Sequence, residues 1–353
     1  MEPKAGIVVV IMVLASLAVI PAALADAEDS DVFRYYSQLD ANGQAVYNSV
    51  SSATSVADTT IHFDVGFEEK DLCLFNESGD AESYAKAIVR DALATVYLSC
   101  PAVPYIWNYP VSGVAVDVHL ETRTVSESGS VYYAATGVAF PLSVPNGITA
   151  DSMKKLDDAV KTIKVTGNTD SEKVQSILSY LNRVVYQKDA EGTVSNMYGA
   201  LVEKKSTSAG IAQAFNHLCA INGIKSVAVT GVSHLAKEET LNVWNEVYLK
   251  GDLDGKSVYQ WFIVDPTYAV EMGMVGYMTD VAADGITHSA SAWYKVDLDV
   301  IGDNSLSSPQ VAEGKYVREG GPSFIELYGE MILMTVIVVI VVAALLYAAK
   351  LNK

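Results

Sequence analysis

The sequence predicts an α+β protein, in which helices pack on antiparallel sheets, between two apolar terminal segments. Two observations support this fold class. Segments with apolar residues at helical spacing are interspersed with segments such as 114–120 (VAVDVHL), where apolar and polar residues alternate as in a half-buried strand. The terminal segments enclose roughly 300 residues, which is enough for two domains.

The first expected domain, residues 30–150, is a small mixed domain of helices and strands. Its apolar residues recur at helical spacing in two stretches and alternate in three others. The helical stretches are 30–56 and 81–97, and the strand candidates are 59–67, 114–124 and 131–142.

The second expected domain, residues 151–300, begins with helices and continues with antiparallel strands. The stretch 151–163 is amphipathic, and Thr169 with Glu172 forms a capping box at the start of the next helix. A further helix is expected over 208–221, where an Asn-Gly pair ends it. The strands that follow are expected over 226–230, 244–249 and 258–264.

Both ends of the chain carry targeting signals. Residues 1–25 combine Lys4, an apolar run and an Ala-Leu-Ala site, which predicts a secretory signal peptide; a retained N-terminal anchor is the alternative. Residues 328–350 contain an apolar run that is long enough, at about 1.5 Å per residue, to cross a hydrocarbon core of roughly 30 Å. A linker over 301–325 precedes this predicted transmembrane helix, and a tail, 351–353, follows it. The sequence therefore predicts a single-pass protein of the cell membrane, with its ectodomain outside and a short cytoplasmic C-terminal tail.

The net charge of −18 and the pI of about 4.6 restrict the partners. An acidic surface disfavours nucleic acid and anionic lipid headgroups, so no nucleic-acid partner is expected. No residue spacing resembles a zinc or haem site, and neither a metal nor another cofactor is expected. Cys73 and Cys100 flank a helical stretch and are the plausible disulfide pair, which leaves Cys219 free. Asn76 begins a glycosylation sequon.

Three blocks of the second domain carry a family resemblance. The first joins 198–202 (YGALV) to 208–215 (SAGIAQAF), the second is 241–245 (LNVWN), and the third is 263–268 (IVDPTY). These blocks resemble those of the transglutaminase-like superfamily, in its membrane-anchored prokaryotic or archaeal form. The resemblance implies a papain-like core and a Cys-His-Asp triad. Ser208 stands at the position of the Cys and Asn242 at that of the His, whereas Asp265 is retained.

These replacements predict a catalytically inactive domain, a pseudoenzyme. In the family triad, the His helps to ionise a thiol at a helix N-terminus, and the Asp orients the imidazole. The Ser208 hydroxyl is a weak nucleophile without a base, and the Asn242 amide neither gains nor loses a proton near neutral pH. Because triad members act as a unit, losing both groups removes several orders of magnitude of rate. In this interpretation Ser208 is the N-cap of its helix, and Asn242 reaches Asp265 through its NH2 group.

Tyr198, Trp244 and His234 are the candidate ligand-binding residues. The first two match family positions, and core packing is their alternative role. His234 is expected in a loop before the strand that carries Asn242, which makes it a candidate relocated base for Ser208. Cys219 lies on the same helical face as Ser208 but about 16 Å further along the axis, so it is not a substitute nucleophile.

Three functions follow from these residues. The first is a membrane-tethered binding module that holds a peptide, a glycopeptide or a surface protein at the former active site. The second is an amide-bond hydrolase or acyl transferase, with Ser208 as nucleophile and His234 as base. The third is a structural component of a surface layer. The first is favoured because the sequence places no base beside Ser208.

Overall fold

The structure is a computed structural model that describes residues 34–107, 114–125, 129–188, 192–235, 238–253, 256–268, 287–290 and 306–311. The predicted signal peptide, the membrane helix 328–350 and most of the linker lie outside these ranges. Among the helices within them, none combines the length and the apolar character of a membrane span.

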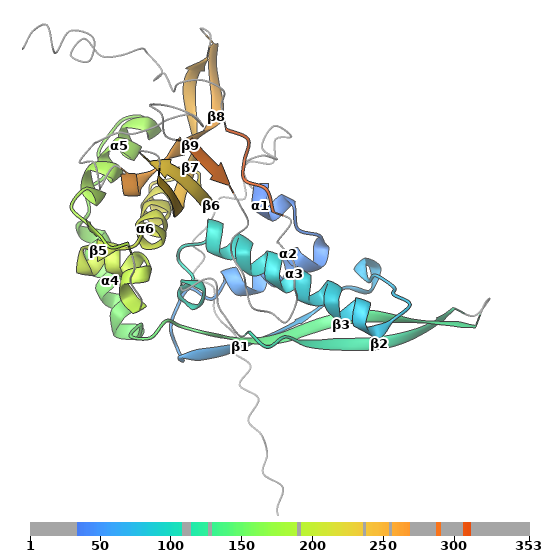
Figure 1. Ribbon diagram of the computed structural model, residues 1–353. Coiled ribbons are helices and arrows are strands. Elements are labelled where there is room, and N and C mark those ends of the chain that lie inside the picture. Colours follow the sequence, from blue (N-terminus) through green and yellow to red (C-terminus); the bar gives the residue numbers. More distant parts are fainter. Residues whose placement is uncertain are drawn as a thin grey trace, which may run out of the picture.

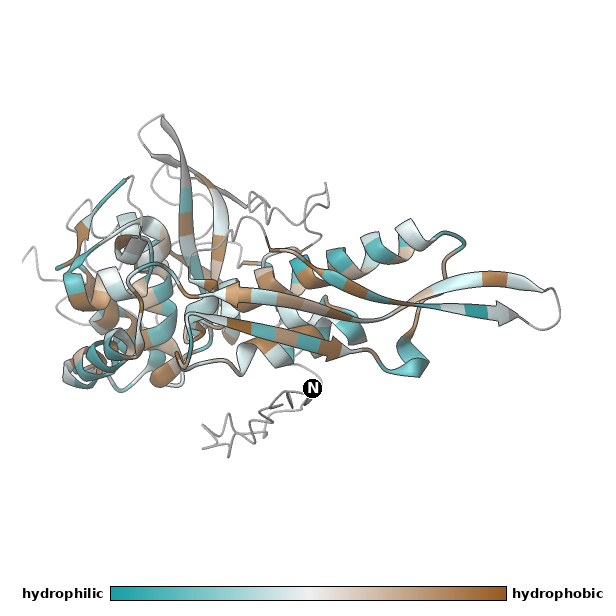
Figure 2. Cartoon of the chain, turned by 90° about the horizontal axis from the view of Figure 1, so that it is seen from below, coloured by the Kyte–Doolittle hydropathy of each residue, from teal (hydrophilic) through white to brown (hydrophobic). Residues whose placement is uncertain are grey.

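The N-terminal region is an antiparallel three-stranded sheet with helices on one face (Figure 1). The strand order is β1-β3-β2, and β2 and β3 continue beyond β1 as a long hairpin (Figure 2). These elements agree with the helices and strands predicted between residues 30 and 150, except that the stretch 30–56 contains two helices and not one. The elements are α1 (Arg34–Ser37), α2 (Ala41–Ser51), β1 (Thr60–Gly66), α3 (Ser78–Ser99), β2 (Asp117–Val125) and β3 (Ser130–Ser143).

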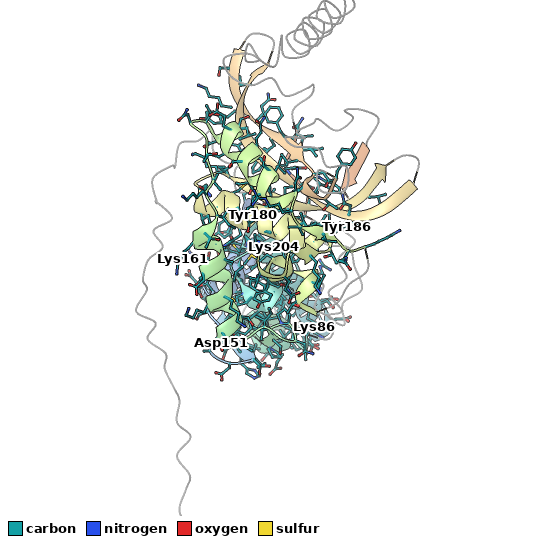
Figure 3. The ribbon with its side chains drawn as sticks, turned by 90° about the vertical axis from the view of Figure 1, so that its left-hand side faces the viewer. Lys86, Asp151, Lys161, Tyr180, Tyr186 and Lys204 are labelled. Carbon is teal, nitrogen blue, oxygen red and sulfur yellow. The ribbon has the colours of Figure 1, made fainter. Side chains whose placement is uncertain are left out.

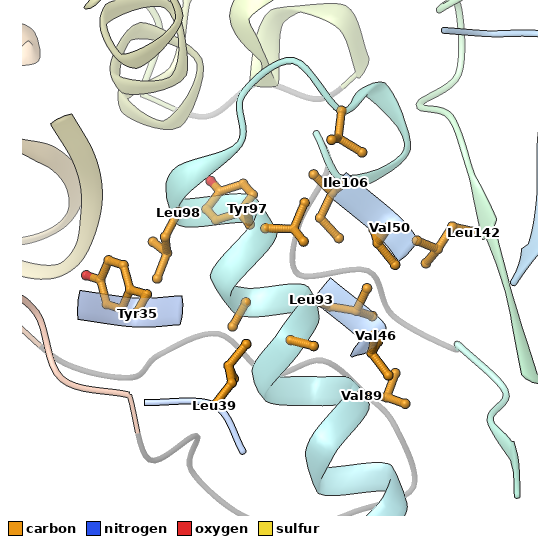
Figure 4. Close-up of a cluster of buried hydrophobic side chains, with 14 of the residues drawn as sticks. Tyr35, Leu39, Val46, Val50, Val89, Leu93, Tyr97, Leu98, Ile106 and Leu142 are labelled. Atoms are coloured by element: carbon orange, nitrogen blue, oxygen red, sulfur yellow. The ribbon is translucent and has the colours of Figure 1, made fainter. Parts of the chain in front are cut away.

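The core of this region lies where α3 meets α2 and the sheet (Figure 4). Val89, Leu93 and Tyr97 recur at four-residue spacing along α3 and are buried, so one stripe of the helix faces inward. Val46 of α2 and Leu142 of β3 are buried in the same cluster. Full burial of each such aliphatic side chain stabilises the fold by roughly 1.5–3 kcal/mol.

Cys73 and Cys100, the plausible disulfide pair, are not bonded to each other, because both thiols are free. The Cys73 sulfur lies 3.5 Å from the Tyr84 hydroxyl, near the start of α3, and the Cys100 sulfur lies 2.9 Å from the Tyr47 hydroxyl, at its end. Sixteen residues of helix separate Tyr84 from Cys100, or about 24 Å at 1.5 Å per residue. A disulfide needs Cα atoms within about 7 Å, so the helix that these cysteines flank holds them apart.

The C-terminal region contains three helices and a four-stranded antiparallel sheet of order β8-β7-β6-β9. The capping box at Thr169 and Glu172 is present, with both of its hydrogen bonds. The regular elements are α4 (Ala150–Thr162), α5 (Asp170–Leu181), α6 (Ser208–Ile221), β6 (Ser226–Leu235), β7 (Glu238–Leu253), β8 (Lys256–Val264) and β9 (Thr287–Ala290). Shorter elements connect α5 to α6: β4 (Val185–Tyr186), the 3-10 turn η3 (Gly192–Ser195), the π-helix η4 (Gly199–Glu203) and β5 (Lys205–Ser206). Helices α5 and α6 pack against the sheet, whereas α4 packs mainly on η4.

The two regions share a core, although the sequence predicts a domain boundary at residue 150. Trp244 and Trp261 of the second sheet belong to the same buried cluster as α3. The Tyr35 hydroxyl of α1 donates a hydrogen bond to the Ala228 carbonyl of β6, at 3.2 Å. Residues 306–311, expected in a free linker, also contact this body, because Val311 forms a parallel bridge with Trp261.

Candidate functional site

The first turn of α6 carries Ser208, but Ser208 is not its cap. Thr207 is the N-cap, and its hydroxyl accepts a hydrogen bond from the Gly210 amide at 3.4 Å. The prediction that Ser208 caps the helix is therefore wrong by one residue. Ser208 is the first helical residue, half-buried, and its side chain makes no hydrogen bond within the described part of the chain.

Gly210 allows the preceding loop to approach this turn closely. A Cβ atom at Gly210 would lie 2.5 Å from the Asn196 carbonyl oxygen, closer than real contacts permit. The Ser206 hydroxyl lies beside the same point and donates to the Val194 carbonyl at 2.7 Å. The backbone before Ser208 is therefore packed against the helix that carries it.

A strained residue ends the π-helix of this loop. Lys204 has a φ of 59°, in the left-handed region that a side chain makes unfavourable. Its ammonium group donates to the Leu201 carbonyl at 2.6 Å and lies 4.6 Å from the centre of the Tyr180 ring (Figure 3). These contacts join α5 to the loop three residues before Thr207 and hold the strained turn in place.

Asn242 and Asp265 lie together, as the sequence predicts. Asn242 is on β7, opposite Gly231 of β6, and its amide nitrogen donates to the Asp265 carboxylate at 2.8 Å. The other Asp265 oxygen accepts from the Tyr268 amide at 3.0 Å. Both side chains are buried, with 6% of Asn242 and 2% of Asp265 exposed. The pair has the form of a His-Asp contact, but the group that faces the carboxylate is an amide, which cannot accept a proton.

Asn245, three residues beyond Asn242, connects β7 to α6 through hydrogen bonds of its side chain. Its side-chain nitrogen donates to the Ala212 carbonyl at 3.1 Å and to the Asn216 side-chain oxygen at 2.8 Å. Asn216 in turn donates to the Leu98 carbonyl of α3 at 3.1 Å. Ala212 lies one turn after Ser208, so this network sets the position of the N-terminal end of α6 relative to the strand that carries Asn242.

Gln213 makes a second polar connection from α6. It donates to the Trp107 carbonyl at 3.3 Å and accepts from the Met197 amide at 3.2 Å. Neither Gln213 nor Asn216 is among the site residues predicted from the sequence. The signal that could have found them is the placement of two amide side chains within an otherwise apolar helix, since such groups need partners when buried.

Two of the three candidate ligand-binding residues are buried in the core. Trp244 is 1% exposed and Tyr198 is 8% exposed, and each belongs to a buried cluster, in agreement with core packing. The prediction that His234 lies in a loop is wrong, because it is part of β6, where its backbone pairs with Glu239 and Thr287. Cys219 is buried, and burial raises the pKa of its thiol.

Within the ranges that the structure describes, no three His, Cys, Asp or Glu side chains are grouped so that they could hold a metal ion. What this region does contain is a capped helix with a hydroxyl on its first turn and a buried amide–carboxylate pair on neighbouring strands.

Comparison with known proteins agrees with this arrangement. The sequence model of the transglutaminase-like superfamily matches residues 157–266, which include Ser208, Asn242 and Asp265. No curated protein matches the chain significantly.

Three solved structures are similar to parts of the chain. A proposed cysteine protease from Cytophaga hutchinsonii is 16% identical, with 51% of this chain and 74% of that chain covered and a TM-score of 0.26. A TGase is 13% identical, with 57% and 55% covered and a TM-score of 0.27. The periplasmic domain of TgpA from Pseudomonas aeruginosa is 16% identical, with 46% and 66% covered and a TM-score of 0.23. Because these scores are low, the assignment rests on the sequence match: residues 157–266 of this chain form a transglutaminase-like domain.

Proposed function

We propose that this chain is a single-pass cell-surface protein whose transglutaminase-like domain is catalytically inactive and binds a peptide, a glycopeptide or a surface protein beside Ser208. One observation carries the proposal. The Asn242 amide donates to Asp265 at the position where the family has a His, and an amide cannot take the proton of the Ser208 hydroxyl. Without that base, the hydroxyl is a hydrogen-bonding group and not a nucleophile.

The first turn of α6 supports a binding role. Amide groups at the start of a helix have no intrahelical partner, and the helix dipole favours an electron-rich oxygen there. The Gly210 amide is already bonded to the Thr207 hydroxyl, so a peptide carbonyl or a carboxylate suits the Ser208 and Ala209 amides together with the Ser208 hydroxyl. Ser208 is half-buried and therefore retains some access to such a group.

Two experiments test inactivity and binding separately. A fluorophosphonate probe, which labels activated serines, should leave Ser208 unmodified in the purified chain. Labelling of Ser208 that disappears in a His234→Ala variant would instead establish the hydrolase alternative. For binding, Ser208→Trp should abolish capture of ligands from an immobilised peptide and glycopeptide array. The matched control is Ser179→Trp, on an exposed position of α5. Equal capture by both variants would place the ligand elsewhere.

A separate experiment tests whether the ectodomain lies outside the cell. Cys73 is exposed, whereas Cys219 is buried. A membrane-impermeant maleimide should therefore label Cys73 on intact cells, and Cys73→Ser should remove the label. Labelling only after lysis would contradict the proposed topology without bearing on the chemistry of Ser208.

The hydrolase alternative has no observation in its favour. It requires His234 to fold back over Ser208 from a loop, and His234 instead lies within β6, between β7 and β9. Its backbone is three residues along the strand from Gly231, the partner of Asn242, which is about 10 Å at 3.3 Å per residue.

A further inference from the structure

Residues 306–311 are held against a part of the body that is distant in sequence. Gln38, which follows α1, makes two hydrogen bonds to the backbone of Ser307: its side-chain nitrogen donates to the Ser307 carbonyl at 2.9 Å, and its side-chain oxygen accepts from the Ser307 amide at 2.8 Å. One amide side chain thus satisfies both backbone groups of one residue, as a neighbouring strand would. Figure 1 shows this short segment, in orange-red, beside α1.

The other end of the segment meets the edge of the second sheet. Val311 forms a parallel bridge with Trp261 of β8, and β8 is the first strand in the order β8-β7-β6-β9. Leu306 and Val311 both pack against the buried cluster that contains Trp261, and Pro309 between them is buried. The segment is therefore held by backbone bonds at Ser307 and by apolar side chains at its two ends.

A related combination is used when proteins bind extended peptides at a sheet edge; here the backbone bonds at Ser307 come from the Gln38 side chain, and Val311 makes a single bridge with β8. Backbone hydrogen bonds give affinity that is largely independent of sequence, and apolar contacts at fixed spacing give selectivity. An edge strand also needs cover, since its open backbone groups pair readily with another chain. Residues 306–311 provide that cover at Trp261, where only 2% of the side chain is exposed.

We propose that Gln38, the outer edge of β8 at Trp261 and the adjoining apolar cluster form an acceptor site for a short peptide with apolar residues five positions apart. Residues 306–311 are its built-in ligand. Because this ligand is part of the same chain, its effective concentration is high, and a free peptide does not displace it. When the built-in segment is prevented from binding, a separate peptide with the same sequence binds at the site in its place. This site does not depend on the function proposed for Ser208.

Hydrogen exchange on the full chain tests the built-in contact. In Gln38→Ala, exchange of the Ser307 amide should accelerate at least tenfold, because its acceptor is removed. Gln44→Ala is the matched control, since Gln44 also donates from its side chain to a carbonyl, that of Leu39, but does not touch Ser307. Unchanged exchange at Ser307 in Gln38→Ala, or equal acceleration in both variants, would overturn the proposal.

A labelled peptide with the sequence of residues 304–313 tests the acceptor site. In the full chain carrying Leu306→Asp and Val311→Asp, the built-in segment should detach, and the peptide should bind. It should not bind the unmodified chain, and adding Gln38→Ala should weaken binding at least tenfold. A peptide carrying the same two Asp substitutions is the control. Binding to the unmodified chain, binding of the control peptide, or no binding to a detached but folded variant would overturn the proposal.

Discussion

The middle and the start of α6 differ in how their polar groups are used. At the middle of the helix, Asn216 and Gln213 are buried and bonded to three separate parts of the chain. At its start, Ser208 is half-buried, and its side chain has no hydrogen bond among the described residues. The difference teaches that position and chemistry are separate features of this helix: the buried amides hold it in place, whereas the Ser208 hydroxyl is not used by any described residue.

The largest expected effect comes from breaking the scaffold. Asn245→Ala should lower the free energy of unfolding by about 3 kcal/mol, because it leaves the buried Asn216 oxygen without its donor and opens a small cavity. Urea denaturation of the variant and the unmodified chain measures this difference in the free energy of unfolding. The control, Asn48→Ala, removes an exposed Asn and should change little. A loss below about 1 kcal/mol in Asn245→Ala would mean that the network does not hold the helix.

Filling the space at Gly210 should have the next largest effect. Gly210→Ala places a methyl group against the Asn196 carbonyl and should destabilise the chain by about 2 kcal/mol, since the loop has to move. Gly79→Ala, near the start of α3, meets nothing within 4 Å and should be neutral or stabilising. Equal stability of the two variants in thermal unfolding would show that the loop is not packed as described.

The cap and the former nucleophile can be compared directly. Thr207→Ala removes the helix cap and should cost about 1 kcal/mol of stability. Ser208→Ala should change the unfolding free energy by less than about 0.5 kcal/mol, because its hydroxyl makes no such bond. If urea denaturation gives the reverse order, Ser208 is the capping residue after all.

A smaller effect is expected from pH. Burial lowers the pKa of His217 on α6, with Asp157 acting in the opposite direction. The folded chain therefore binds a proton less readily than the unfolded chain, so the stability from this group is present above its ordinary pKa of about 6.5 and is lost as the pH falls below it. Unfolding midpoints at pH 7.5 and pH 5.5 should differ less in His217→Gln than in the unmodified chain. An identical difference would show that His217 is not linked to folding.

Much of the fold could be predicted because it rests on local patterns. The capping box at Thr169 and the amphipathic spacing of α5 are readable from neighbouring residues, as is the alternation in β1 and β3. The register of the family motifs also predicted the bond between Asn242 and Asp265.

The predictions that failed did so at points where residue types alone do not decide the structure. Thr207 and Ser208 are both suitable caps, and residue type alone does not tell which of the two adjacent hydroxyls accepts from the Gly210 amide. His234 is in a strand because β6 pairs on one side with β7 and on the other with the distant residues 287–290, and the second pairing is not revealed by any local pattern. The two cysteines that flank α3 stay apart because the helix between them is long and unbroken.

The most direct test restores the missing chemistry and measures the thiol. Ser208→Cys is made alone and together with Asn242→His, each with Cys73→Ser to remove the exposed native thiol. The rate of iodoacetamide alkylation is then followed against pH, with the modified residue identified by mass spectrometry. If the scaffold has kept its geometry, the introduced thiol should titrate well below about 8.5 when the His is present, and at higher pH without it. The same titration in both variants would contradict the central claim, since it would place the restored imidazole out of reach of the first turn of α6.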